Sequence, residues 1–74
     1  MIIQIHIKSV YGEEKAYPKN HAAQCLADIA GTKTLTHFTL RQALSMGCTI
    51  VELDRHDRES RRYSGAAANV PATR

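Results

Sequence analysis

Hydrophobic and polar residues alternate strictly near the start of the chain. The alternating positions are Ile3, Gln4, Ile5, His6, Ile7 and Lys8. A period of two in β-branched residues predicts a strand whose isoleucines lie on the buried face. Residues 11–14 contain a glycine and two acids, which predicts a turn, and residues 15–17 before Pro18 predict a short return strand. The chain is therefore expected to begin with a β-hairpin.

A helical spacing follows the hairpin. Asn20 is a favourable N-cap, and Gly31 is a favourable residue just past a helix end, so a helix is expected between them. Its apolar residues at positions i, i+4, i+7 and i+8 are Ala22, Leu26, Ile29 and Ala30. This stripe is predicted to face the core.

A second helix is expected after Thr36, which is a suitable N-cap. Leu35 precedes the cap and Leu40 lies four residues into the helix, the spacing of a hydrophobic staple. The predicted buried stripe is Leu40, Ala43 and Leu44. Gly47 ends this helix, and the β-branched segment at residues 48–53 predicts a final strand.

The order β-β-α-α-β predicts an α+β fold in which two helices pack on one face of a small three-stranded sheet. The compact domain is expected to cover residues 1–53. From residue 54 onward the composition changes to charged residues and then to small ones. Residues 54–74 are therefore predicted to form a flexible, disordered, arginine-rich tail.

Length and composition limit the protein class. A chain of 74 residues with 43% hydrophobic residues has room for one domain with a modest core. No apolar run approaches the roughly 20 residues of a membrane span, so we expect no membrane partner and a cytoplasmic location. Cys25 and Cys48 are both interpreted as buried thiols in a reducing compartment.

The excess positive charge lies mainly in the C-terminal segment. The net charge is +3, and the last 21 residues hold five arginines against three acids, whereas the first 53 hold five basic residues against four acids. Arg55, Arg58, Arg61 and Arg62 form a candidate phosphate-contacting arm. The alternative is a solvated terminus of mixed charge, because Asp57 and Glu59 are interleaved with the arginines.

Residues 26–44 resemble a helix-turn-helix. The matching positions are Ala27, Gly31, Leu40 and Leu44, whereas His37 stands where an aliphatic residue is usual. The resemblance implies phosphate contacts by Lys33, Thr34 and Thr36, and base contacts by His37, Arg41 and Gln42. The alternative interpretation is an ordinary helical hairpin that covers one face of the sheet.

Catalytic and metal sites are not expected. His21 and Cys25 have the i,i+4 spacing of two metal ligands, but no Cys-x-x-Cys pair accompanies them. Cys25, His21 and Asp28 fall on one short helix, where no pocket would close around a substrate. We therefore expect no enzyme activity, no metal and no cofactor.

A second resemblance covers about residues 11–51. It is carried by Tyr17-Pro18, Ala23, the sequence IAGTKTLT at residues 29–36, Thr39-Leu40 and Gly47. This pattern is similar to that of short uncharacterised proteins of bacterial phages and other mobile elements. It implies an accessory protein that binds DNA or inhibits a host protein.

Two functional hypotheses follow. The first is a DNA-binding protein that uses the helical hairpin at residues 20–46, with the arginine segment as an auxiliary arm. The alternative is a protein-interaction module or inhibitor of a bacterial host protein, with Gln4, His6 and Lys8 on a working sheet face opposite the helices or with an open strand edge as the contact. A homodimer is compatible with both hypotheses, because self-association would enlarge a small core.

Overall fold

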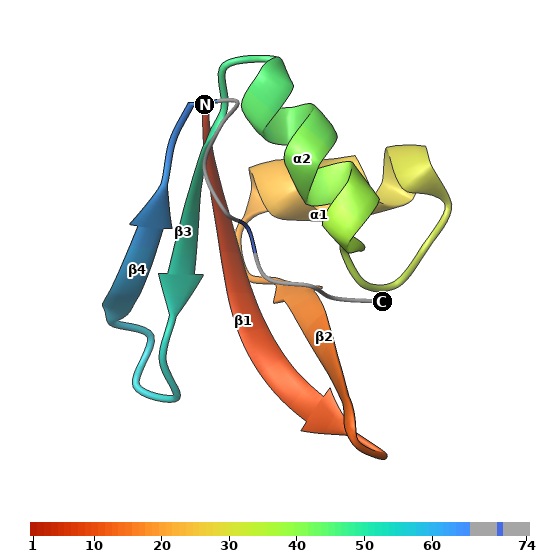
Figure 1. Cartoon of the computed structure of the whole chain (residues 1–74), viewed down its shortest axis with the longest axis vertical. Coiled ribbons are helices and arrows are strands. Elements are labelled where there is room, and N and C mark those ends of the chain that lie inside the picture. Colours follow the sequence, from red (N-terminus) through yellow and green to blue (C-terminus); the bar gives the residue numbers. More distant parts are fainter. Residues whose placement is uncertain (66–69, 71–74) are drawn as a thin grey trace.

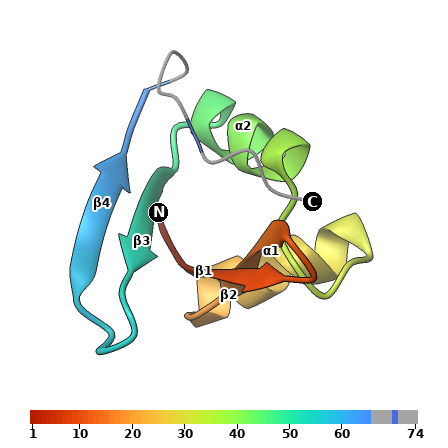
Figure 2. The same ribbon diagram turned by 60° about the horizontal axis from the view of Figure 1, so that its bottom comes forward.

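The computed structural model describes residues 1–65 and Val70, which form four strands and two helices (Figure 1). The elements are β1 (Ile2–Val10), β2 (Glu13–Pro18), α1 (His21–Ala30), α2 (His37–Ser45), β3 (Thr49–Leu53) and β4 (Glu59–Tyr63). The strands make one mixed sheet in the order β2-β1-β3-β4. The α+β fold is confirmed at this level. Figure 2 shows the strong twist of the sheet, in which β1 and β2 run across the direction of β3 and β4.

The predicted N-terminal hairpin is present. β1 and β2 pair antiparallel and are joined by Tyr11 and Gly12, which both have positive φ angles, 53° and 80°. Two consecutive left-handed residues make the tight turn whose twist matches that of the flanking strands. The turn therefore fixes the register of the hairpin, in which Val10 lies opposite Glu13.

The core lies between the helices and one face of the sheet. Ile3 and Ile5 of β1 are fully buried, as their alternation predicted, and Ile3 lies beside Ile50 of the parallel neighbour β3. α1 packs mainly on β1 and β2, and α2 packs on β3. The helices contribute Ala23, Ala27, Leu40, Ala43 and Leu44 to the same cluster. Both helices therefore cover the face that bears the isoleucines.

Asn20 fixes the start of α1 to the central strand. Its Oδ1 accepts hydrogen bonds from the backbone N–H of Ala23 at 2.9 Å and of Gln4 at 3.2 Å. Its Nδ2 donates to the carbonyl of Ile2 at 2.9 Å. The predicted N-cap is thus confirmed, and it also joins helix to sheet. Gly31, with φ of 73°, ends α1 in the left-handed conformation that favours glycine.

The start of α2 also agrees with the sequence. Thr36 Oγ1 accepts from the backbone N–H of Thr39 at 3.2 Å, and both Leu35 and Leu40 are fully buried. The backbone N–H of Leu35 donates to the carbonyl of Ala16 at 2.8 Å. This bond fixes the connection between the helices to β2 just before α2 begins.

The predicted buried stripe of α1 is wrong in part. The fully buried residues are Ala23 and Ala27, whereas Ile29 is 84% exposed and Ala30 is also exposed. Small alanines let the helix approach β1 and β2 closely, and the larger Leu26 is left on the flank of the contact. The helix is therefore rotated away from the orientation that its apolar spacing indicated.

The prediction of three strands is also wrong. Residues 59–63, expected in the tail, form β4 antiparallel to β3, and a bulge occurs between Glu52 and Leu53. An edge strand needs backbone pairing on only one side, so a polar sequence without alternation can still form one. Tyr63 and Val70 pack on the core cluster. This packing differs from the prediction of a tail that contributes no residue to the core. The rest of the predicted tail, residues 66–69 and 71–74, lies outside the described residues.

The cysteines differ in environment. Cys48 is buried as expected, but Cys25 is exposed, so the prediction of two buried thiols is wrong for Cys25. The reason is the same rotation of α1, which places Cys25 outside the contact with the sheet. Among the described residues, no helix is both long and apolar enough to cross a membrane.

Candidate functional site

We call the sheet face opposite the helices the open face; it carries polar and charged residues together with a few apolar ones. Pairing registers place on it Gln4, His6, Lys8 and Val10 of β1, Glu13, Lys15 and Tyr17 of β2, the buried Val51 and Leu53 of β3, and Glu59 and Arg62 of β4. Side chains alternate between faces along a strand, so these residues lie opposite the buried isoleucines. The residues come together only through the register of four strands.

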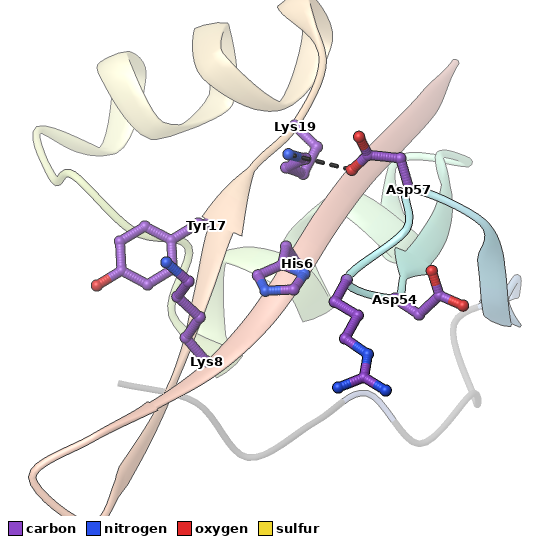
Figure 3. Close-up of a pocket in the computed structure, with 7 residues that line it drawn as sticks. His6, Lys8, Tyr17, Lys19, Asp54 and Asp57 are labelled. Carbon is purple, nitrogen blue, oxygen red and sulfur yellow. Dashed lines mark ion pairs between the residues drawn. The ribbon is translucent and has the colours of Figure 1, made fainter.

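A hollow of about 410 Å³ lies on the open face, next to the β3–β4 turn (Figure 3). It is lined by His6, Lys8, Tyr17, Lys19, Asp54, Arg55 and Asp57. Three of these residues are permanent cations and two are acids. What the hollow would attract therefore depends on whether the two acids are free.

Both acids of the hollow are already engaged. Asp57 forms an ion pair with Lys19 at 3.2 Å. Asp54 accepts hydrogen bonds from the backbone N–H groups of His56 at 2.8 Å and Arg58 at 3.0 Å, and so shapes the turn. These bonds, that from Arg58 first, lower the pKa of the Asp54 carboxyl below its ordinary value. Both carboxylates are thus committed to local structure.

The remaining cations of the open face have no acidic partner among residues 1–65 and Val70. Lys8 lies directly opposite Lys15 in the β1–β2 ladder. Its ammonium lies 5.7 Å from the centroid of the Tyr17 ring, which is a cation–π arrangement. Like charges directly opposite each other destabilise a sheet, so this pair lowers stability unless an anion binds there. Arg55, in the turn, also lacks an ion-pair partner in the described part of the chain.

His6 occupies the middle of the open face. It lies opposite Tyr17 on one side and beside Leu53 on the other. Its Nδ1 is 3.3 Å from the carbonyl oxygen of Leu53. A proton on Nδ1 would donate to that oxygen, which fixes the ring and leaves Nε2 for another partner.

The arginines of β4 are divided between the two faces. Arg62 is on the open face but pairs with Glu59, with Nη2 and Oε1 2.9 Å apart. This contact lowers the pKa of Glu59 and raises that of Arg62. Arg61 lies opposite Glu52, on the side of the helices. Neither arginine therefore adds an unpaired cation to the open face.

Glu52 also accepts a hydrogen bond from the hydroxyl of Tyr63 at 3.0 Å. Partial burial, followed by this bond, raises the pKa of Tyr63. The bond joins β3 to β4 on the helix side of the sheet. It helps to hold the edge strand against the core.

The residues predicted to contact nucleic acid are divided between the helical hairpin and the β3–β4 hairpin. Lys33, Arg41 and Gln42 are exposed around the helical hairpin, whereas Thr34, Thr36 and His37 are half-buried. Thr36 is engaged as the N-cap of α2. Arg55 lines the hollow and Arg58 is exposed in the same turn. The structure thus brings Arg55, but not the residues of the helical hairpin, to the open face.

Sequence reasoning missed three residues of this face, Lys15, Tyr17 and Lys19, and considered His6 and Lys8 for protein contacts but not for nucleic acid. The available signal was the polar half of the alternation in β1, which predicted an exposed face. The missing information was the register that places Lys8 beside Lys15 and His6 beside Tyr17. It depends on the turn at Tyr11 and Gly12.

A second concave surface, which we call the apolar groove, lies between α1 and α2. It has a volume of about 280 Å³ and is lined by Met1, Ile3, His21, Ala22, Cys25, Leu26, Ile29, Ala43, Met46 and Cys48. Met1, Ile29 and Met46 are 75–84% exposed. No lining side chain carries a permanent charge, so the groove suits an apolar surface.

His21 and Cys25 meet at the edge of this groove, with Cys25 Sγ 3.4 Å from His21 Nε2. Asp28, the third residue of the group considered above, accepts instead from Gln24 Nε2 at 3.0 Å. Within the described part of the chain, no three His, Cys, Asp or Glu side chains are arranged to hold a metal ion.

Comparison with protein-family models, curated proteins and solved structures gave no match. Any functional assignment therefore rests on the chemistry of the open face and of the apolar groove.

Proposed function

We propose that this chain is a small non-enzymatic nucleic-acid-binding protein that holds the phosphate backbone on the open face of its sheet. The observation that carries the proposal is the pairing of Lys8 with Lys15, next to a hollow whose acids are already engaged. Lysine and arginine side chains that neutralise phosphates release counterions, which favours binding.

The hollow adds two further cations. Arg55 has no ion-pair partner among the described residues, and the bond between Lys19 and Asp57 is made by side chains that are 37% and 67% exposed. An exposed ion pair of this kind contributes little to stability. The Lys19 ammonium has three N–H donors and its side chain is partly exposed, so it can also donate to a phosphate while it stays paired with Asp57.

The helical hairpin is a competing interface for the same function. Lys33 and Arg41 are exposed there and could contact phosphates, as the helix-turn-helix resemblance implies. The two interfaces make different predictions for single substitutions. Removing a cation from the open face weakens binding in our proposal, whereas removing Lys33 or Arg41 does so in the hairpin hypothesis.

The test is fluorescence anisotropy with labelled DNA at several salt concentrations. Arg55→Ala and Lys8→Ala are each expected to weaken binding. Each should also reduce the magnitude of the slope of log affinity against log salt concentration by about one. Lys33→Ala and Arg41→Ala are matched controls of the same charge change and are expected to bind like the original chain. Weaker binding by the Lys33 and Arg41 variants alone would assign DNA binding to the hairpin. Absence of binding at low salt would refute nucleic-acid binding altogether.

A second candidate function, protein interaction, is favoured by the apolar groove. We propose a second copy of the chain as its occupant. Each chain carries a net charge of +3, and no lysine or arginine lines the groove, so two copies meet there without bringing those side chains together. Ile29 and Met46 are exposed beside the apolar groove. In a two-fold dimer these side chains of one copy would fit into the groove of the other, and the reverse, because both copies use the same surface.

A further inference from the structure

The centre of the open face is a row of three flat or apolar side chains. Tyr17 of β2 lies directly opposite His6 of β1, and His6 lies beside Leu53 of β3. Leu53 is only 9% exposed although it is on the face away from the core. Tyr17 and His6 are half-buried. These three side chains therefore form a low surface across β2, β1 and β3, which we call the floor of the open face.

Cations surround this floor. Lys8 and Lys15 lie in the next row of the sheet, and Lys19 and Arg55 line the hollow at its other sides. In Figure 3 the Lys8 side chain extends over the Tyr17 ring, and the His6 ring lies between Tyr17 and the β3–β4 turn. Lys8 is exposed, so its side chain is free to rotate away from the Tyr17 ring. Its ammonium can then contact a phosphate while another planar group stacks on the ring.

We infer that the open face takes single-stranded nucleic acid, with an unpaired base stacked on Tyr17 and His6 and its flanking phosphates on Lys8, Lys19 and Arg55. This inference rests on the proposed function and names its substrate class. Proteins that bind single strands combine a cationic groove with aromatic side chains on which bases stack. Tyrosine and histidine both serve as such platforms.

The size and shape of the site favour a single strand over a duplex. A hollow of about 410 Å³ is at the lower end of the 300–1,000 Å³ typical of ligand pockets, which suits one nucleotide. In a duplex the faces of the bases are covered by their neighbours in the stack. A duplex would therefore contact the cations and leave the row of Tyr17, His6 and Leu53 unused.

The test compares a single-stranded oligonucleotide about 12 nucleotides long, within the usual site size, with the duplex of the same sequence. Anisotropy is measured for the full chain and for Tyr17→Leu, Tyr17→Phe and Phe38→Leu. Tyr17→Leu keeps an apolar side chain but loses the ring, so it is expected to weaken single-strand binding by about tenfold. Tyr17→Phe keeps the ring and is expected to bind within about twofold of the original chain. Phe38→Leu, at an exposed aromatic residue of α2 that does not line the hollow, is the matched control and is expected to have no effect.

The outcomes separate this inference from the proposed function. Tighter binding of the single strand, lost in Tyr17→Leu and kept in Tyr17→Phe, supports both. Equal or tighter binding of the duplex, or single-strand binding that is unchanged in Tyr17→Leu, overturns the single-strand inference and leaves phosphate binding in place. Absence of binding to either form overturns both. Thermal unfolding of each variant separates lost contacts from lost structure, and Tyr17→Phe provides a second readout if Tyr17→Leu is unstable.

Discussion

Lys8 and Lys15 lie directly opposite each other across the β1–β2 ladder, on the face of the sheet that no helix covers. A like-charged pair at such a position destabilises a sheet, whereas an opposite-charged pair stabilises it by about 0.2–1 kcal/mol. The pair therefore links stability to the proposed function: the arrangement that is less favourable for folding is the one that favours an anionic ligand.

Substituting one member of this pair is expected to change stability and binding in opposite directions. Lys15→Glu would place an acid opposite Lys8 and raise the free energy of unfolding by about 0.5 kcal/mol, while weakening nucleic-acid affinity. Urea unfolding and anisotropy measure the two effects. Lys33→Glu makes the same charge change without a cross-strand partner and is expected to alter neither by much. A simultaneous gain in stability and affinity for Lys15→Glu would contradict the proposed binding face.

Asn20 is expected to be among the most sensitive polar positions. Asn20→Ala removes an N-cap and two bonds to β1, which we expect to lower the free energy of unfolding by about 2 kcal/mol. Thr36→Ala removes a cap and a hydroxyl contact with Thr39 in the same turn but no bond to a strand, and should cost about 1 kcal/mol. Asn20→Asp keeps the acceptor but loses the donor to Ile2, so its loss should fall below that of Asn20→Ala. Denaturant unfolding of all three tests this order, and equal losses for Asn20→Ala and Thr36→Ala would show that the bonds to β1 contribute nothing.

The stability of the β3–β4 edge should fall at alkaline pH. Burial and the bond to Glu52 raise the pKa of Tyr63 in the folded chain above its unfolded value near 10. The resulting stabilisation is fully present below the unfolded pKa and is lost as pH rises through the folded pKa. Tyr63→Phe removes this titration, so the difference in unfolding free energy between the two proteins should shrink or reverse above about pH 10. A difference that stays constant across this range would show that the phenol is not coupled to folding.

The apolar groove provides a test of self-association. Ile29→Ser is expected to leave the free energy of unfolding within about 0.5 kcal/mol, because Ile29 is 84% exposed and surface substitutions usually have small effects. The same change should shift the chain from dimer to monomer in sedimentation experiments. Phe38→Ser is the control, since Phe38 is also exposed on a helix but does not line the groove. A monomeric original chain, or equal effects of the two changes, would rule out a dimer at the groove.

The sequence predicted those parts of the fold whose cause is local. The alternation at Ile3, Ile5 and Ile7 gave the first strand and its buried face, and the caps at Asn20 and Thr36 gave both helix starts. The apolar spacing through Ile29 predicted the wrong buried face for α1. A helix packs through the residues that allow the closest approach, and here these are Ala23 and Ala27. An apolar residue left outside the core also fits an intermolecular contact, and spacing alone does not distinguish the two.

The remaining errors have a common origin in long-range pairing. β4 has the sequence Glu59-Ser60-Arg61-Arg62-Tyr63, which shows no apolar alternation, and it forms because β3 offers an unpaired edge. The candidate site depends on the same kind of pairing. Tyr17 and Lys19 come from the end of β2 and the position just after it, Arg55 comes from the β3–β4 turn, and only the registers of β1 with β2 and β3 bring them to one hollow.

The central position of β1 has a consequence for how the chain folds during synthesis. The ribosome makes β1 before its parallel neighbour β3, with β2 and both helices between them in sequence. The local turn lets β2 cover one edge of β1 early, but the other edge awaits β3, a contact of long sequence separation that forms slowly. An uncovered strand edge pairs readily with other chains. Nascent chains stalled before β3 should therefore aggregate. Pairing of β3 with β1 should be the step that lowers this tendency.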